Sequence, residues 1–327
     1  MLCSRMRQSV LVMAGGLAVV ALVAGACGGT EPANGDASAA LPALETTSST
    51  IAPASTDSVS TTTTRPETLP PSTTTTPVTS TTEALPVVGT RPFGQPRPEW
   101  IGTQLLALRP GDDLGVALPT PPDLVDRQFW TIDHLPPPAD STFESSLISP
   151  PPPDVLVRST WREGCPVPID ALAYGQVSFY GFDGLFHTGE FIVHRDFGEA
   201  VVGIFSALHE ARFPIEEMRV TTLSELDAHP TGDSNNTASF VCRNAVNSSR
   251  WSRHAHGGAI DINPFHNPFR RGDLVLPELA SAYIDRTNER PGMVTPEVVA
   301  LFRDIGWGWG GNWRSVDDWM HFSDTGN

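Results

Sequence analysis

Apolar residues recur with regular spacing mainly between residues 165 and 327. Residues 190–194 are typical of a strand, and a helical apolar stripe follows them. The pattern predicts a helix that is N-capped by Asp196, with Glu199 three residues later completing a capping box. The helix should end at Phe213-Pro214, and its stripe, which we assign to the core, consists of Val201, Ile204, Phe205 and Leu208.

A second helix is predicted near the C-terminal end of the sequence. Thr295 suits the N-cap, Pro296 suits the first helical position, and Gly306 suits the end of the helix. Its core-facing stripe consists of Val298, Leu301, Phe302 and Ile305. Helices and strands therefore mix in residues 165–327, which predicts an α+β domain long enough to bury a proper core.

Two other segments combine strand-like alternation with polar side chains. In residues 252–264, a polar loop with two glycines runs into a short apolar stretch in which Asp261 should face away from its isoleucine neighbours. In residues 307–322, His321 lies between Met320 and Phe322 and should also alternate with them. In each segment the apolar side chains should therefore face the core, and the chemically active side chain should lie on the opposite face of the strand.

The first residues of the chain have the pattern of an export signal. Two arginines precede an apolar run of about 17 residues that ends at Ala26. Small residues before Cys27 and glycines after it resemble a bacterial lipoprotein signal, in which Cys27 would become the lipidated first residue. A conventional secretory peptide and an uncleaved anchor are the alternatives. For an anchor, the apolar run is at the short limit for a membrane-spanning helix. Each version, with residues 1–26 as the signal, places the rest of the chain outside the cytoplasm.

Two segments of unusual composition separate the signal from the domain. Residues 27–90 are mostly threonine, serine, proline and alanine, so they cannot offset the entropy of ordering and are predicted to be a disordered tether. Residues 91–164 contain proline runs at 136–138 and 150–153 and no long periodic segment. They are predicted to form an extended arm that packs against the domain.

Charge and residue counts exclude several classes of function. The formal net charge is −16, from 21 basic and 37 acidic residues, which disfavours binding to nucleic acid. All of the basic residues are arginine, so Schiff-base chemistry on lysine and the phosphate-loop lysine are excluded. Four cysteines are too few for a dense disulfide scaffold.

The two polar segments together offer the ligands of a zinc site. Two imidazoles, His254 and His321, and the carboxylate of Asp261 form a three-ligand set that leaves a fourth position for water. Zinc in such a site polarises a carbonyl group and lowers the pKa of its water towards about 7. A further carboxylate must take the water's proton, and Asp318, three residues before His321, can do so if the chain turns between them.

The spacing of these residues resembles a family of bacterial cell-wall peptidases. The pattern Ser-x-His-x-x-Gly-x-Ala-x-Asp at residues 252–261 and Asp-x-x-His at residues 318–321 are similar to the zinc D-alanyl-D-alanine carboxypeptidases and dipeptidases and the L-alanyl-D-glutamate endopeptidases. The resemblance also includes the motifs at 181–184, 187–190, 240–243 and 263–268. It implies a fold made of a small antiparallel sheet flanked by helices. The sequence departs from the family pattern at Ser323, where an acidic residue often follows the His-Phe pair.

The same resemblance implies roles for individual residues. His254, Asp261 and His321 would be the zinc ligands and Asp318 the general base, while Arg243 would contact the substrate or the developing oxyanion. Among further candidates for substrate binding, Ser252 belongs to the first motif. His256 would share the face of His254 on a strand, and Trp309 would either line a groove or belong to the packing.

Two cysteines remain if Cys3 leaves with the signal and Cys27 is lipidated. Cys165 and Cys242 would then face an oxidising compartment, where disulfides persist. We expect a bridge between them, with buried thiols or a metal-ligating Cys242 as the alternatives.

These observations favour an exported, monomeric zinc peptidase that acts on the stem peptides of peptidoglycan. An N-terminal lipid would be its contact with the membrane. A non-haem iron oxygenase is disfavoured, because six residues separate His254 from Asp261, where such enzymes use a His-x-Asp or His-x-Glu pair. A wall-binding module that keeps the metal but has lost its base remains the alternative, since aspartate at 318 is shorter than glutamate. The sequence leaves open which peptide bond is cleaved.

Overall fold

The computed structural model describes residues 91–326. The predicted signal (1–26), the predicted lipidation site Cys27 and the predicted tether (27–90) lie outside these described residues. Within residues 91–326, no helix is both long enough and apolar enough to cross a membrane. Short helices combine with small, mostly antiparallel sheets, which confirms the predicted α+β class.

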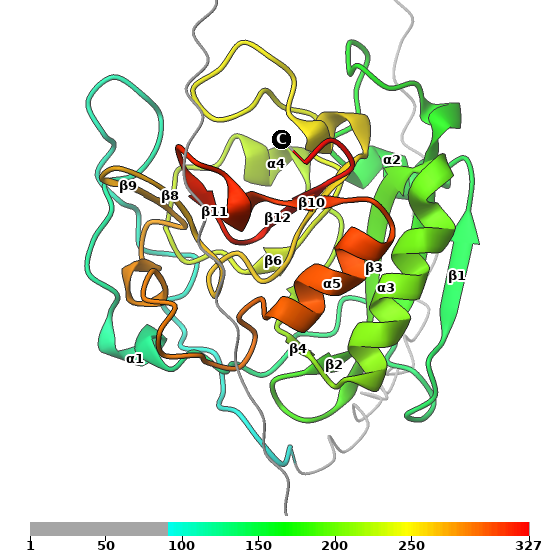
Figure 1. The fold of residues 1–327 in the computed structure, drawn as a ribbon, viewed down its shortest axis with the longest axis horizontal. Helices are drawn as coiled ribbons and strands as arrows, with labels where there is room; N and C mark the ends of the chain where they lie inside the picture. The colour runs from blue at the N-terminus through cyan, green and yellow to red at the C-terminus, as the bar shows by residue number, and fades with distance from the viewer. Residues whose placement is uncertain (1–90, 327) are drawn as a thin grey trace, which may run out of the picture. The chain divides into compact units, whose positions relative to one another are not determined.

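A long hairpin forms the centre of the largest sheet (Figure 1). Its strands are β2 (Leu172–Gly181) and β3 (Phe186–His194), which includes the predicted strand at 190–194. β1 (Ser145–Ile148) pairs antiparallel with β2, and β4 (Pro214–Ile215) pairs in parallel with the end of β2. Because side chains alternate along a strand, odd-numbered residues of the hairpin lie on one face and even-numbered residues on the other.

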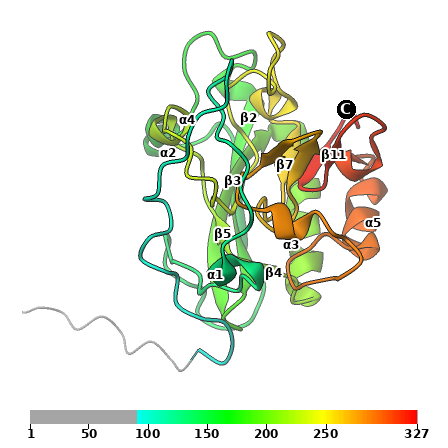
Figure 2. The ribbon, with the colours of Figure 1, turned by 90° about the vertical axis from the view of Figure 1, so that its left-hand side faces the viewer.

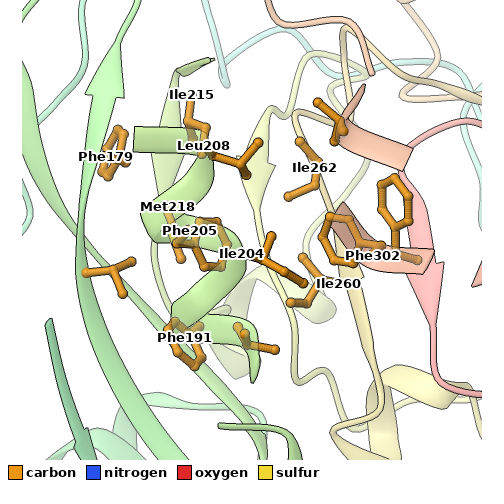
Figure 3. Close-up of a cluster of buried hydrophobic side chains, with 14 of the residues drawn as sticks. Phe179, Phe191, Ile204, Phe205, Leu208, Ile215, Met218, Ile260, Ile262 and Phe302 are labelled. Atoms are coloured by element: carbon orange, nitrogen blue, oxygen red, sulfur yellow. The ribbon is translucent and has the colours of Figure 1, made fainter. Parts of the chain in front are cut away.

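Two helices cover the odd-numbered face of this sheet. α3 (Gly198–Glu210) and α5 (Pro296–Asp304) bury the predicted stripes in one apolar cluster with residues of β2 and β3 (Figure 3). Phe302 of α5 stacks on Phe322 with ring centroids 3.8 Å apart. Burial of each such side chain stabilises the fold by about 1.5–3 kcal/mol, so this cluster is the main source of stability.

The two helices begin differently. α5 starts as predicted, with Thr295 at the N-cap and Pro296 first, and Gly306 beyond its end adopts a positive φ of 83°. Before α3 the chain makes a 3₁₀ turn over Arg195–Phe197, and the Asp196 backbone N–H donates to the His194 ring. The predicted capping box at Asp196 is therefore wrong.

A second small sheet continues the layer beyond β3. It has the order β10 (Gly308–Trp309), β12 (His321–Ser323) and β7 (Ala259–Asp261). Residues 238–240 join the two sheets: the Phe240 backbone N–H donates to Ile192 O at 3.1 Å, and Ala238 forms an antiparallel bridge with Asp261. The predicted strands at 259–262 and around His321 are thus confirmed, over Ala259–Asp261 and His321–Ser323, and the structure shows that they are neighbours in one layer.

Shorter elements complete the fold. Figure 2 shows α2 (Pro153–Arg158) and α4 (Leu223–Leu226) on the side away from α3 and α5. β5 (Glu217–Met218) and β6 (Asn236–Thr237) form a short parallel pair. Three further strands, β8 (Phe269–Arg271), β9 (Leu274–Leu276) and β11 (Asp317–Asp318), form a third sheet.

A disulfide joins Cys165 to Cys242, with Cα atoms 5.9 Å apart. Cys242 is buried in an apolar cluster on this second face, together with Val155 of α2 and Phe240. The bridge therefore connects the entrance of the hairpin to the segment that links the two sheets.

Residues 91–164, predicted as an arm, contribute directly to the folded structure. Besides β1 and α2, they contain α1 (Pro122–Val125), which Leu124 anchors in an apolar cluster with Phe265 and Tyr283. Arg127, only 1% exposed, forms a two-pronged ion pair with the buried Glu216 at 2.7 Å. Because removal of one partner would leave a buried charge unpaired, this pair holds the segment firmly in place.

A buried histidine also connects this segment to the hairpin. His187 of β3 lies between two carboxylates, with Nδ1 2.8 Å from Asp133 and Nε2 2.9 Å from Asp183. Arg91 lies 3.3 Å from the other oxygen of Asp183. Burial acts to lower the pKa of His187, but hydrogen bonds and charge from both aspartates outweigh it and raise that pKa above 6.5.

This raised pKa predicts a pH-dependent stability. A histidine with a raised folded-state pKa stabilises the fold fully below its unfolded pKa, about 6.5, and the stabilisation is lost as pH rises through the folded value. We expect the free energy of unfolding, measured by urea denaturation, to fall from pH 6 to pH 9 more steeply in the wild type than in His187→Gln. Parallel curves for the two proteins would contradict this role.

Candidate metal centre

The pairing of two short strands places two of the predicted ligands side by side. In the antiparallel pair β7–β12, His321 is directly opposite Asp261, and Phe322 is opposite Ile260. Ile260 and Phe322 belong to the main apolar cluster under α3 and α5. Because neighbouring residues in a strand point to opposite faces, Asp261 and His321 lie on the face away from these helices.

The third predicted ligand comes from a single 3₁₀ turn, Arg253–His256, which lies next to β3. Ser252 caps the turn by accepting the His254 backbone N–H at 3.3 Å. Gly257 ends it with a φ of 68°, which favours glycine. Its carbonyl accepts the His194 backbone N–H at 2.8 Å, and a Cβ atom at Gly257 would lie 2.4 Å from that nitrogen.

An ion pair links this turn to the strand of His321. Arg253 donates to Asp324 through Nε at 2.7 Å and Nη2 at 2.5 Å, a two-pronged arrangement that fixes orientation. The Asp324 backbone N–H also donates to Gly258 O at 3.0 Å. Ser323, where an acidic residue was expected, is followed by Asp324, which holds the turn that carries His254 through Arg253.

Three side-chain atoms converge at this point. His254 Nε2 lies 3.1 Å from His321 Nδ1 and 3.2 Å from Asp261 Oδ1, and His321 Nδ1 lies 3.0 Å from the same oxygen. Ligand atoms about 2.1 Å from a tetrahedral zinc lie roughly 3.3–3.4 Å from one another, so these separations fit a shared ion. Within the described chain, the ligand atoms of His254, Asp261 and His321 all lie within 4.8 Å of one another, so the three residues could hold one metal ion.

Hydrogen bonding prepares His254 for such a role. Its Nδ1 lies 2.5 Å from the backbone carbonyl oxygen of Ser239, which accepts a hydrogen and cannot donate one. Nδ1 must therefore carry the proton in the neutral ring, which leaves the Nε2 lone pair directed at the other two groups. Ser239 is held in turn by its hydroxyl, which donates to Ile192 O at 2.6 Å.

Asp318 reaches the same site from β11, which pairs with β8. The close approach requires Gly310, since a Cβ atom there would lie 2.6 Å from the carbonyl oxygen of Asp318 and 2.8 Å from its Cβ. In the described chain, Asp318 Oδ1 is buried and makes no hydrogen bond. A buried carboxylate oxygen without a partner is rare in structural positions, so it is available to accept a proton within the site.

The two carboxylates of the site differ in their affinity for protons. Burial raises the pKa of Asp318 to about 7, and the negative charge of Asp261 acts in the same direction, against His321 and Arg243. Burial also acts to raise the pKa of Asp261, but the charges and hydrogen bonds of His254 and His321 hold it well below its usual range. One carboxylate thus stays ionised, as a ligand must, and the other can carry a proton near neutral pH.

Residues 246–324 match the family model described as D-alanyl-D-alanine carboxypeptidase. The match confirms the predicted resemblance over about a quarter of the chain. It contains His254, Asp261, His321 and Asp318, and it supports a peptidase of this family type. No curated protein and no solved structure gave a significant match to the chain.

The other predicted site residues occupy varied positions around this carboxypeptidase-like segment. Arg243 lies just before it, half-buried, with Nη1 donating to Asn244 O at 3.0 Å and its charge acting on Asp318. Trp309 donates from Nε1 to Trp319 O at 2.9 Å and packs against the main apolar cluster. His256 is half-buried in the 3₁₀ turn rather than in a strand, so the expectation that it shares the face of His254 does not hold.

Some contributors to the site were not predicted from the sequence. The Ser239 carbonyl orients His254, and backbone groups leave no signal in a residue pattern. Trp313, one of the tryptophans expected either to line a groove or to belong to the packing, lies against His321 with ring centroids 5.4 Å apart, a contact that the sequence did not indicate. Gly310 is one of several glycines in the segment 307–313, and its contact with Asp318 depends on a pairing between distant strands.

We expect the protein to bind one Zn²⁺ per chain at this site. Mutation of a residue that only hydrogen-bonds to a metal ligand typically lowers metal affinity 10- to 100-fold, and loss of a ligand itself should cost at least as much. Asp261→Asn and His321→Ala should therefore each bind zinc about 100-fold more weakly. Calorimetric titration with a competing chelator measures the affinity. Asp317→Asn is the matched control, because Asp317 adjoins Asp318 but pairs with Arg270 outside the group. Unchanged affinity in both ligand variants would contradict the assignment.

Proposed function

We propose that the protein is an exported zinc-dependent peptidase that hydrolyses the stem peptides of peptidoglycan. The observation that carries this proposal is the convergence of His254 Nε2, Asp261 Oδ1 and His321 Nδ1 beside the unpartnered carboxylate of Asp318. These residues lie in the segment that matches the carboxypeptidase family. The lipoprotein-like signal and the tether would place the domain at the cell envelope, anchored to the membrane by a lipid on Cys27.

The residues divide the work of peptide hydrolysis among them. Zinc, held by the three ligands, would supply a Lewis acid for the scissile carbonyl group and favour deprotonation of the attacking water. Asp318 accepts the proton of that water and donates it to the leaving amine. Its buried Oδ1, which has no hydrogen-bond partner in the described chain, is available for this proton. The Ser239 carbonyl, which accepts from Nδ1 of His254, keeps that ring in the orientation in which its Nε2 lone pair faces the ion.

Arg243 supplies the positive charge of the site. It is the arginine whose charge reaches Asp318, and its guanidinium can bind a carboxylate or an oxyanion with two parallel hydrogen bonds. In a carboxypeptidase this group would bind the terminal carboxylate of the substrate, and in an endopeptidase it would stabilise the developing oxyanion. Both types of cleavage are consistent with the residues present.

Asp318→Asn should abolish turnover while zinc binding remains stoichiometric. The amide cannot accept the proton, and loss of general-base catalysis lowers kcat by about 100- to 10,000-fold. Hydrolysis of purified peptidoglycan, followed by mass spectrometry of the released fragments, measures activity and identifies the bond. A chelator should abolish wild-type activity, and Asp317→Asn should retain it. Zinc-loaded wild type without any activity on wall fragments would favour the alternative of a non-catalytic wall-binding module.

Arg243→Lys should lower kcat/KM by about tenfold or more. Lysine keeps the charge but loses the planar fork, and charge-assisted hydrogen bonds contribute about 1.5–3 kcal/mol each. Steady-state kinetics on the same substrate measures the effect, and Arg250→Lys, an exposed arginine on the same loop, is the control. Equal kinetics for both variants would remove Arg243 from the mechanism.

A further inference from the structure

Residues 132–142 form a segment, which we call the strap, that few contacts hold to the rest of the fold. The strap runs from the buried Thr131 to Phe143, which packs against the main apolar cluster. Within residues 91–326, it contains no helix or strand, and its backbone makes no hydrogen bond to the backbone of another segment. Residues 136–138 are prolines and have no backbone N–H to donate. The position of the strap therefore depends on its side chains.

Two polar side-chain contacts attach the strap to the described part of the chain, and each joins a histidine to a carboxylate. Asp133 Oδ1 lies 2.8 Å from Nδ1 of His187 in β3. His134 Nε2 lies 3.1 Å from Glu217 of β5. Because a histidine gains or loses its charge near neutral pH, the attachment of the strap depends on groups that titrate in that range.

The contact at His187 requires a proton on the ring. Its two nitrogens face two carboxylates, with Asp133 at 2.8 Å and Asp183 at 2.9 Å. A neutral imidazole has one N–H and one lone pair, whereas an ionised carboxylate can only accept. A neutral His187 would thus donate to one aspartate and direct a lone pair at the other. Both contacts are hydrogen bonds when the ring is an imidazolium ion.

We propose that His187 is a pH switch, in which the imidazolium holds the strap on the hairpin and loss of its proton releases Asp133. Asp183 keeps its hydrogen bond after this loss, because its side chain is fully buried and cannot exchange the ring for water. It also accepts the Leu185 backbone N–H at 3.2 Å and lies 3.3 Å from Arg91. The Asp133 side chain is 35% exposed, so water can replace its hydrogen bond.

The charges around His187 set the direction of the switch. In the described chain it faces Asp133 from the strap, Asp183 from the turn between β2 and β3, and the uncharged Phe179 ring from β2, with Arg91 beyond Asp183. Burial acts to lower the pKa of His187, but the two aspartates outweigh it and raise that pKa above 6.5. The strap is therefore attached at pH 6 and is released as pH rises through the raised value.

The second contact does not need a charged ring. His134 faces one carboxylate, Glu217, which also accepts from Arg219 at 2.6 Å and from Arg97 at 3.3 Å. A neutral His134 can still donate from Nε2, although a hydrogen bond without charge on the donor is weaker. His134 thus remains an anchor of the strap while the contact of Asp133 is lost.

Methyl NMR of the full chain tests the switch directly. Methyl labels on isoleucine and leucine report Ile132 and Leu135, which flank the two attachment residues, and a ring label on histidine reports the proton of His187. Between pH 6 and pH 9 the order parameters of both methyl groups should fall, with the same midpoint as the titration of His187. Ile148, 49% exposed but paired within the sheet by β1, is the internal reference and should not change.

Asp133→Asn is the decisive variant. Its amide can donate to Nδ1 of a neutral ring, so the strap should stay attached over the whole pH range. Loss of the negative charge should also lower the titration midpoint of His187 by about 1–3 pH units. Asp133→Ala, which can make neither contact, should show the released strap already at pH 6.

Asp140→Asn is the matched control. Asp140 belongs to the strap, and its carboxylate accepts the Thr142 backbone N–H at 2.7 Å inside the strap rather than a group of the hairpin. This variant should therefore titrate like the wild type.

Two results would overturn the switch. One is a His187 ring that is already neutral at pH 6. The other is equal motion of Ile132 and Leu135 at pH 6 and pH 9 although His187 loses its proton between them. Neither measurement involves zinc or peptide hydrolysis, so this inference and the proposed function stand or fall separately.

Discussion

The register between β7 and β12 is the constraint on which the candidate site depends. It places His321 opposite Asp261 and, in the same pairing, Phe322 opposite Ile260. A shift of one residue would turn the two polar side chains into the core and expose the phenylalanine that stacks on Phe302. The energy of burial under α5 therefore selects the same register that brings the two ligand atoms to 3.0 Å. Core packing and the geometry of the candidate metal centre are in this way specified together.

The layer as a whole separates structure from chemistry by its two faces. The face towards α3 and α5 is filled with aliphatic and aromatic side chains. The other face carries carboxylates, imidazoles and arginines beside the apolar cluster around Cys242, and several of its buried charged groups are paired with a neighbour from a distant part of the sequence. Residues 91–164 supply several of these neighbours, including Arg127 and Arg158. A segment that adds little to the main core thus supplies partners for buried carboxylates elsewhere in the fold.

The sequence allowed the main outline of this arrangement to be predicted. The stripe of α3, the boundaries of α5 and the strands around Asp261 and His321 follow from periodicity, because each buries a regular apolar face. The three converging side chains and Asp318 follow from motif spacing.

Features that depend on tertiary contacts were not predictable in the same way. Asp196 is a good N-cap by residue type, but the 3₁₀ turn after β3 satisfies its backbone through His194. The turn at His254 is irregular, so its placement depends on Gly257 fitting against β3 and on the Arg253–Asp324 pair.

The Cys165–Cys242 bridge has a consequence for how the protein matures. Cys242 directly precedes Arg243, and its backbone N–H donates to the hydroxyl of Thr160 at 2.9 Å, so the chain on both sides of the bridge is packed together. The bridge joins residues 77 positions apart and so restricts the conformations of the unfolded chain. Without it the unfolded chain has more conformational entropy, and the folded state is less stable by a few kcal/mol. A newly made chain with reduced thiols would hold Arg243 less firmly beside Asp318. Under the export and peptidase activity proposed above, oxidation would act as a maturation step that coincides with arrival in a compartment where disulfides persist, and a precursor retained before that point would be a poor hydrolase.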